Sequence, residues 1–149
     1  KRTPPLRTDS DLELIEEGMR DGTIDIIATD HAPHDLVDKQ VEFSKACFGI
    51  VGLETALPLT LKMVDEKIIS LEKAIGMLTF RPNQIFGLDK GILGIGKTAD
   101  ITLFNEKEEY LIDPNKFKSR SKNSPYKDWK VRGKILQTIV NGNTIFKSN

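Results

Sequence analysis

In several segments of the first ninety residues, hydrophobic residues recur three and four positions apart, which is the spacing of amphipathic helices. Ser10 and Glu13 have the spacing of a capping box at the first helix, and Asp21-Gly22 follows its last apolar position. Ser70 is a second candidate cap, and Gly87 a second candidate end. The pattern predicts helices over residues 10–20, 53–65 and 70–78, with a short helical turn over residues 82–86.

One apolar run has no helical period. Residues 24–29 are mostly β-branched and, apart from Asp25, uncharged, without alternation of polar and apolar positions. This pattern predicts a buried strand of a parallel sheet with both faces covered. Residues 30–52 then show no clear period. Irregular segments of this length are uncommon inside compact domains and are functional or disordered, so functional residues are expected here.

The pattern changes at a glycine cluster formed by Gly91, Gly94 and Gly96. Beyond it, Asn141-Gly142 is a strong hairpin signal because a type I′ turn needs positive φ at both positions. The apolar residues now predict short strands over residues 99–104, 110–112, 130–132, 135–140 and 145–146. We therefore expect an α/β part over residues 1–90 and a small all-β part over residues 91–149.

Composition narrows the class of protein. Lysine plus arginine and aspartate plus glutamate number 22 each, so no basic surface for nucleic acid is expected. The single Cys47 cannot form an internal disulfide, which favours a reducing compartment, the cytoplasm, and we expect it to pack within its loop. No apolar run approaches the roughly 20 residues that span a bilayer. The chain begins at Lys1 in a proline-bearing stretch, and we expect it to be a piece of a longer protein.

Titratable chemistry is concentrated where the predicted strand ends. Asp30 follows the strand directly, and both histidines of the chain, His31 and His34, flank Pro33. A carboxylate at the end of a buried strand is costly unless it is paired or binds a metal. Asp30 is therefore a candidate metal ligand or general base; the alternative is that it caps the following turn. A catalytic zinc needs three protein ligands, so most ligands would come from outside this chain.

The chain resembles the dihydroorotases of the amidohydrolase superfamily, in their long bacterial form. Thr29-Asp30-His31-Ala32-Pro33-His34 is similar to a late signature of that family. Further matching segments occur in the family's order along essentially the whole chain, namely residues 4–7, 21–25, 48–55, 85–88, 96–100 and 123–126.

The resemblance implies a fold and a reaction. It implies that residues 1–90 are the C-terminal part of a (β/α)8 barrel, with residues 24–30 as the eighth strand, and that residues 91–149 are the C-terminal share of a small β-sandwich. The implied reaction is the reversible, zinc-dependent cyclisation of N-carbamoyl-L-aspartate to dihydroorotate in pyrimidine biosynthesis. The cofactor would be a zinc pair, Zn2+, held mostly by residues upstream of this chain, including a His-x-His motif.

The resemblance also implies roles for individual residues. Asp30 would bind one zinc and carry the proton between water and the ring nitrogen. His34 would hold the substrate's carboxylate, unless it only bonds its own loop. Phe48 and Gly49 would contact the substrate ring through their backbone, unless Gly49 only relieves a turn. Thr3 stands where the family usually has a substrate-contacting Asn, and it lacks the amide's paired donor and acceptor.

Two other functions stay open. One is a cyclic amidohydrolase of the allantoinase or hydantoinase kind, which a basic group at His34 argues against. The other is a non-catalytic subunit that supports aspartate transcarbamoylase, and Thr3 is the one residue that favours this function. In each case we expect a homo-oligomer, and we expect the isolated 149-residue piece to be inactive. For His31 we expect a structural hydrogen bond.

Overall fold

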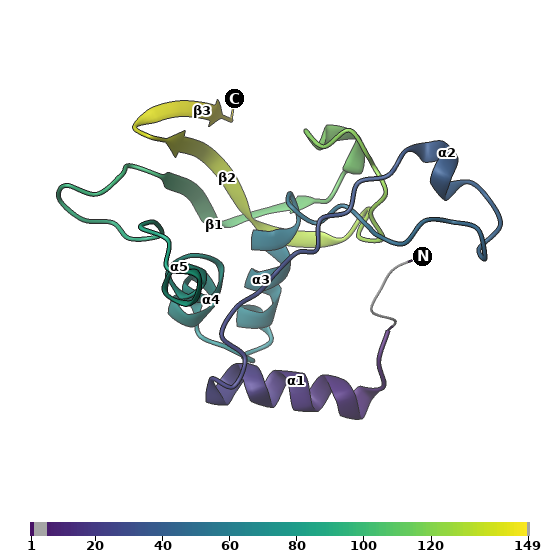
Figure 1. Cartoon of the computed structure of the whole chain (residues 1–149), viewed down its shortest axis with the longest axis horizontal. Helices are drawn as coiled ribbons and strands as arrows, with labels where there is room; N and C mark the ends of the chain where they lie inside the picture. The colour runs from purple at the N-terminus through teal and green to yellow at the C-terminus, as the bar shows by residue number, and fades with distance from the viewer. Residues whose placement is uncertain (2–5, 149) are drawn as a thin grey trace.

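The computed structural model describes Lys1 and residues 6–148. Helices occupy the first part of the chain and a three-stranded sheet the last. Figure 1 shows α1 along one edge of the molecule and the sheet along the opposite edge, with α3 between them. The helices are α1 (Asp9–Asp21), α2 (Leu36–Lys39), α3 (Ala56–Asp65), α4 (Leu71–Leu78) and α5 (Phe80–Phe86), and a 3-10 turn, η1, spans Pro114–Lys116. Among the described residues, no helix is both long and apolar enough to cross a membrane.

The N-cap of the first helix lies two residues before the predicted one. Thr8, rather than Ser10, is the N-cap, and its hydroxyl accepts a hydrogen bond from the backbone N–H of Asp11 at 3.3 Å. Asp11 completes the capping box in place of Glu13, because its carboxylate accepts the Thr8 N–H at 3.1 Å. The predicted end is confirmed, since Gly22 closes the helix with a φ of 93°.

The later helices follow the predicted pattern with shifted starts. The predicted helix over residues 53–65 begins only at Ala56, because residues 53–55 form a turn. The predicted helix over residues 70–78 is confirmed as α4, with the Ser70 hydroxyl accepting from the Lys73 N–H at 3.2 Å. The short turn is a longer helix, α5, and Gly87 ends it with a φ of 65°.

The core of the helical part joins α1 to α4. Met19 of α1 packs with Ile68, Ile69, Ala74 and Met77, all of them buried. Half-buried apolar side chains from residues 24–27 and from α3 cover this cluster. The helices thus hold the segment that leads to Asp30.

Residues 24–29, predicted as a buried strand of a parallel sheet, form no strand among the described residues. No neighbouring strand pairs with this segment among the described residues, and its side chains are half-buried or exposed. Instead the Ile27 N–H donates to the Met77 carbonyl of α4 at 3.1 Å, and a single parallel bridge follows between His31 and Ile50. The reason is physical: a strand is defined by a ladder of backbone hydrogen bonds, and the helices beside this segment cannot supply one.

The C-terminal strands are longer than predicted. The stretches 99–104 and 110–112 lie in one strand, β1 (Ile101–Leu111), whose polar middle is irregular where it passes β2 (Lys130–Val140). The order is β1-β2-β3, all antiparallel, with β3 at Asn143–Lys147. The predicted hairpin turn is confirmed, with φ of 49° at Asn141 and 77° at Gly142.

The sheet packs directly on α3. Gly133 of β2 has a φ of 93°, and a Cβ there would lie 2.3 Å from Cδ1 of Leu61. Next to it, Arg132 donates through Nε to the Asp65 carboxylate at the end of α3, at 2.7 Å. The fold is therefore α/β with a three-stranded antiparallel sheet seated on a helix, and α3 connects that sheet to the segment around Asp30.

Candidate functional site

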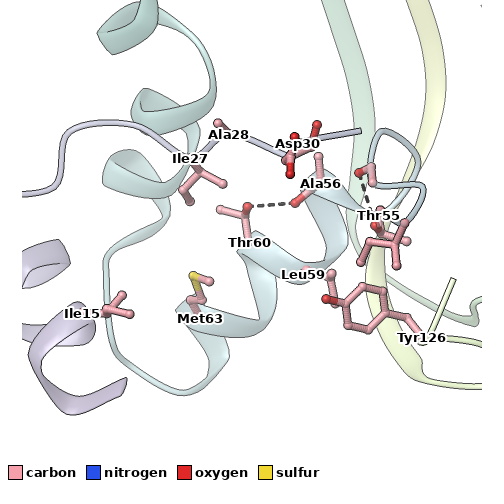
Figure 2. A pocket seen from close by; sticks show the side chains of 14 residues that line it. Ile15, Ile27, Ala28, Asp30, Thr55, Ala56, Leu59, Thr60, Met63 and Tyr126 are labelled. Atoms are coloured by element: carbon pink, nitrogen blue, oxygen red, sulfur yellow. Dashed lines mark hydrogen bonds between the residues drawn. The ribbon is translucent and has the colours of Figure 1, made fainter. Parts of the chain in front are cut away.

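Asp30 lies at the edge of a cavity of about 500 Å3. The cavity lies between residues 27–30, residues 49–52 and one face of α3, and Tyr126 contributes from the C-terminal part of the chain. Figure 2 shows Asp30 beside the start of α3, with the side chains of Ala56 and Thr60 below it. The backbone of Asp30 has a φ of 45°, a left-handed conformation that Asp tolerates better than most residues do.

The Asp30 carboxylate is the one charged group among the described residues that line this cavity. The hydroxyls nearby already have backbone partners: Thr60 donates to the Ala56 carbonyl at 2.8 Å, and Thr55 to the Gly52 carbonyl at 3.2 Å (Figure 2). No described residue forms a hydrogen bond or ion pair with Asp30, so the alternative that it caps the turn is wrong. The side chain of Asp30 is exposed in this part of the protein, so solvent reaches its carboxylate; an accessible carboxylate without a partner can bind a metal ion or transfer a proton.

His31 has the structural role expected for it. Its Nδ1 accepts hydrogen bonds from the backbone N–H groups of Gly52, at 3.1 Å, and Leu53, at 3.3 Å. A nitrogen that accepts cannot carry a proton, so Nε2 is the protonated nitrogen of the neutral ring, and it lies 3.5 Å from the Ser119 hydroxyl. The ring thereby ties the residue after Asp30 to the start of the α3 region.

His34 bonds to its own loop, which is one of the two roles left open by the sequence. Its Nε2 lies 2.7 Å from the Phe48 carbonyl oxygen, and since a carbonyl only accepts, Nε2 is protonated. Of the expected site residues, Gly49 shares the cavity with Asp30, whereas His34 and Phe48 are not among the described lining residues. Thr3 lies outside the described residues.

Gly49 is needed for a close approach of two backbone segments. Its φ is 128°, and a Cβ there would lie 2.4 Å from Cβ of Ala32. Its N–H donates to the Lys1 carbonyl at 3.1 Å, and its own carbonyl accepts from Lys39 Nζ at 2.8 Å and Asn123 Nδ2 at 2.9 Å. The Gly49 backbone groups therefore already have partners within the chain.

Three polar residues at the site had no predicted role. Besides the Gly49 carbonyl, Lys39 donates to the Cys47 carbonyl of the same loop at 2.6 Å and to the Lys1 carbonyl at 3.2 Å, and nothing in its sequence context indicates this. Asn123 opens a segment that matched the family, which was a usable signal. Glu54 accepts the Ser119 N–H through Oε1 at 2.8 Å, while its buried Oε2 has no partner among the described residues.

The described residues offer Asp30 alone as a ligand for a metal in the cavity. Among the described residues, no group of three or more His, Cys, Asp or Glu side chains with converging ligand atoms includes Asp30. An unpaired carboxylate fits a metal as one ligand, and a zinc site would need at least two more protein ligands from beyond this part of the chain.

Comparison with known proteins places this geometry in a family. The sequence profile of the Amidohydrolase family matches residues 2–145. Dihydroorotase from Syntrophotalea carbinolica is 48% identical over 147 residues, which cover 99% of this chain and 35% of the relative. Dihydroorotase from Acetivibrio thermocellus is 47% identical over 148 residues, with the same coverage. The solved structure of L-hydantoinase (dihydropyrimidinase) from Arthrobacter aurescens is similar with a TM-score of 0.89 and 31% identity, over 99% of this chain and 34% of that one. The chain spans about 35% of the length of the curated relatives it matches.

Proposed function

The chain belongs to the amidohydrolase family, and on that premise we propose that the protein carrying it is a metal-dependent dihydroorotase. It would interconvert N-carbamoyl-L-aspartate and dihydroorotate. The observation that carries the proposal is the Asp30 carboxylate. It has no partner among the described residues, and it is the one charged group among those that line the cavity. The substrate class is chosen because relatives 48% and 47% identical over 99% of the chain bear the name dihydroorotase.

The proposal includes the wider architecture. Residues 1–90 would be the C-terminal part of a (β/α)8 barrel and residues 91–149 the C-terminal share of a small β-sandwich. The apolar segment 24–29 supports the first part, because its composition is that of a buried strand and none of the described residues pairs with it as a neighbouring strand. Neighbouring barrel strands from the rest of the protein would cover it, and would place Asp30 at the C-terminal end of a strand, where barrel enzymes keep their chemistry.

Asp30 would serve both as a ligand and as a proton carrier. A zinc pair, when bound, lowers the pKa of a coordinated water and polarises a carbonyl group. During ring closure the ureido nitrogen loses a proton as it bonds to the carboxyl carbon, and water leaves. Asp30 Oδ would take up that proton and pass it to the departing carboxylate oxygen, which gains its second proton from solvent and leaves as water. In the opening direction Asp30 would return a proton to the ring nitrogen. General acid–base transfer of this kind contributes about 10²–10⁴-fold to a rate.

His34 and the loop after it would recognise the substrate. With Nε2 donating to Phe48, a neutral His34 has no second N–H, so only the imidazolium could donate from Nδ1 to a carboxylate. The backbone at Phe48 and Gly49 would contact the substrate ring. For this, the Gly49 backbone would give up hydrogen bonds that it now makes within the chain and form them with the substrate instead. Thr3 would offer one hydroxyl where an Asn offers an amide.

The proposal is tested with Asp30→Asn in the full-length protein. We expect ring closure to fall at least about 10²-fold with thermal stability unchanged, because Asn tolerates the same positive φ and Asp30 has no partner to lose. Asp25→Asn is the matched control, since Asp25 is an exposed acid on the same segment that does not line the cavity. Wild-type rates in Asp30→Asn, or an equal loss in Asp25→Asn, would contradict the proposal.

Substrate choice is tested separately. Hydantoin is the runner-up because of the structural likeness to L-hydantoinase, at 31% identity. We expect dihydroorotate to be opened with the higher kcat/KM, and preference for hydantoin would replace the proposed substrate.

Location and assembly complete the proposal. A cytoplasmic enzyme agrees with the unpaired, exposed Cys47. Self-association, and association with aspartate transcarbamoylase, are tested by sedimentation of the full-length protein alone and mixed with that enzyme.

A further inference from the structure

Three side chains with different ligand atoms come together where residues 34–38 meet residue 47, in the loop that follows Asp30. One ring nitrogen of His34, a carboxylate oxygen of Asp38 and Sγ of Cys47 all lie within 4.8 Å of one another. We propose that these residues bind a thiophilic divalent cation of the Zn2+ or Cd2+ kind. Imidazole, carboxylate and thiolate are the ligand types that zinc takes in proteins, and none of the three residues is in the described lining of the Asp30 cavity.

A backbone hydrogen bond holds together Asp38 and Cys47, the two ligands that are far apart in the sequence. The Cys47 N–H donates to the Asp38 carbonyl at 3.2 Å, which closes the loop between them. Lys39 strengthens the closure by donating through Nζ to the Cys47 carbonyl at 2.6 Å and to the Gly49 carbonyl at 2.8 Å. The convergence of Asp38 and Cys47 is therefore set by main-chain contacts, so a cation would not have to order a free loop.

His34 is held in the tautomer that a metal ligand requires. Its Nε2–H donates to the Phe48 carbonyl at 2.7 Å, so the neutral ring keeps its free lone pair on Nδ1. A ligating histidine almost always donates its other ring N–H to a backbone carbonyl, a carboxylate or water. The proposed site therefore takes Nδ1 of His34 as its ligand atom, because Nε2 already donates to Phe48.

Charge and access also favour a divalent ion. The Asp38 carboxylate and a Cys47 thiolate would together balance two positive charges, with a neutral imidazole as the third ligand. Asp38 and Cys47 are exposed, so an ion can reach them without opening the fold. The expectation that Cys47 packs inside its loop is wrong for the same reason. Three protein ligands leave a fourth position of a tetrahedral site open to water or an outside ligand.

Occupation of this site would affect substrate binding, a consequence that rests on the proposed function. If His34 holds the substrate's carboxylate, a cation on its Nδ1 removes the nitrogen that would donate to it. The cation would then inhibit by competition, raising the KM for dihydroorotate while leaving kcat unchanged.

Cadmium titration of the purified full-length protein tests the site directly. Cd2+ bound to a thiolate absorbs in the ultraviolet, and we expect a saturable band that is present in the wild type and missing in Cys47→Ser. Asp38→Asn should weaken Cd2+ binding by at least about tenfold, since even loss of an outer partner of a ligand costs that much. Asp35→Asn, a charge-matched change on the same loop at a residue outside the cluster, should bind as the wild type does.

The same titration defines what would overturn the site. An identical band in Cys47→Ser, or equal affinities for Asp38→Asn and Asp35→Asn, would refute it. A second measurement needs no variant of the cysteine: Zn2+ should slow the reaction of Cys47 with a thiol reagent several-fold in the wild type and less in Asp38→Asn. Equal protection in both would also refute the site. Retained Cd2+ binding without competitive inhibition would leave the site standing and would contradict the proposed role of His34 instead.

Discussion

Substituting Gly49 by alanine should be far more damaging than a single methyl group suggests. A φ of 128° is a conformation that residues with a Cβ rarely adopt, and such strain costs about 1–3 kcal/mol. The new Cβ would also lie 2.4 Å from Cβ of Ala32 and 3.1 Å from its carbonyl oxygen, and overpacking of this kind costs about 1–3 kcal/mol. The expected loss in the free energy of unfolding is therefore about 2–6 kcal/mol, against a total of about 5–15 kcal/mol for a typical domain.

Urea unfolding followed by circular dichroism measures this loss, and Gly22→Ala provides the matched control. Gly22 also has a positive φ, 93°, but nothing lies within 4 Å of the added Cβ, so only the conformational cost of about 1–2 kcal/mol is expected. Adding Ala32→Gly to Gly49→Ala should recover part of the difference, because it removes the closest contact. The double-mutant cycle isolates that contact.

A loss of stability in Gly49→Ala no larger than in Gly22→Ala, or no recovery when Ala32→Gly is added, would contradict this prediction. A functional readout accompanies the physical one. Because Gly49 lines the Asp30 cavity, the substitution should raise the KM for dihydroorotate in the full-length protein even at temperatures where the variant stays folded.

Three further predictions follow from named contacts. His31→Phe should lower the free energy of unfolding by about 1–3 kcal/mol in urea, because two backbone N–H groups lose their acceptor. Arg132→Met should cost about 1 kcal/mol at low salt and less at high salt, as the ion pairs of Arg132 with Asp65 and Glu106 are screened; a salt-independent loss would assign the effect to packing or to the hydrogen bond that Arg132 donates to the Glu106 carbonyl. The hydrogen bond from Lys90, and a second one from a backbone N–H, hold the pKa of the Asp100 carboxyl below its ordinary value of 3.8. The stability that the Asp100 carboxylate gives the fold is therefore present above pH 3.8 and is lost as the pH falls through the lowered pKa. The stability difference between wild type and Asp100→Asn should therefore shrink in acid, and a constant difference would contradict this.

Local chemistry could be predicted from the sequence because its interactions span few residues. Three predictions of this kind were confirmed: the Ser70 cap, the helix end at Gly22 and the Asn141-Gly142 turn. Each depends on the conformation of one or two residues and on contacts with their immediate neighbours in the sequence. The cap at Thr8 was missed by two positions, because Thr8 and Ser10 both begin capping patterns and only the folded backbone chooses between them.

Long-range pairing could not be predicted in this way. Apolar, β-branched residues 24–29 satisfy every local rule for a strand, yet a strand exists only where a second backbone completes its hydrogen bonds, and helices lie there instead. The C-terminal ends of the helices, the hairpin and the candidate reactive group Asp30 could be read from the sequence. The folded structure was needed to show that Asp30 lies beside a cavity with no partner among the described residues, that His34 donates to Phe48, and that Asp38 and Cys47 meet. These contacts join residues whose separation carries no periodic signal, because they depend on where loops return and not on local conformational preference.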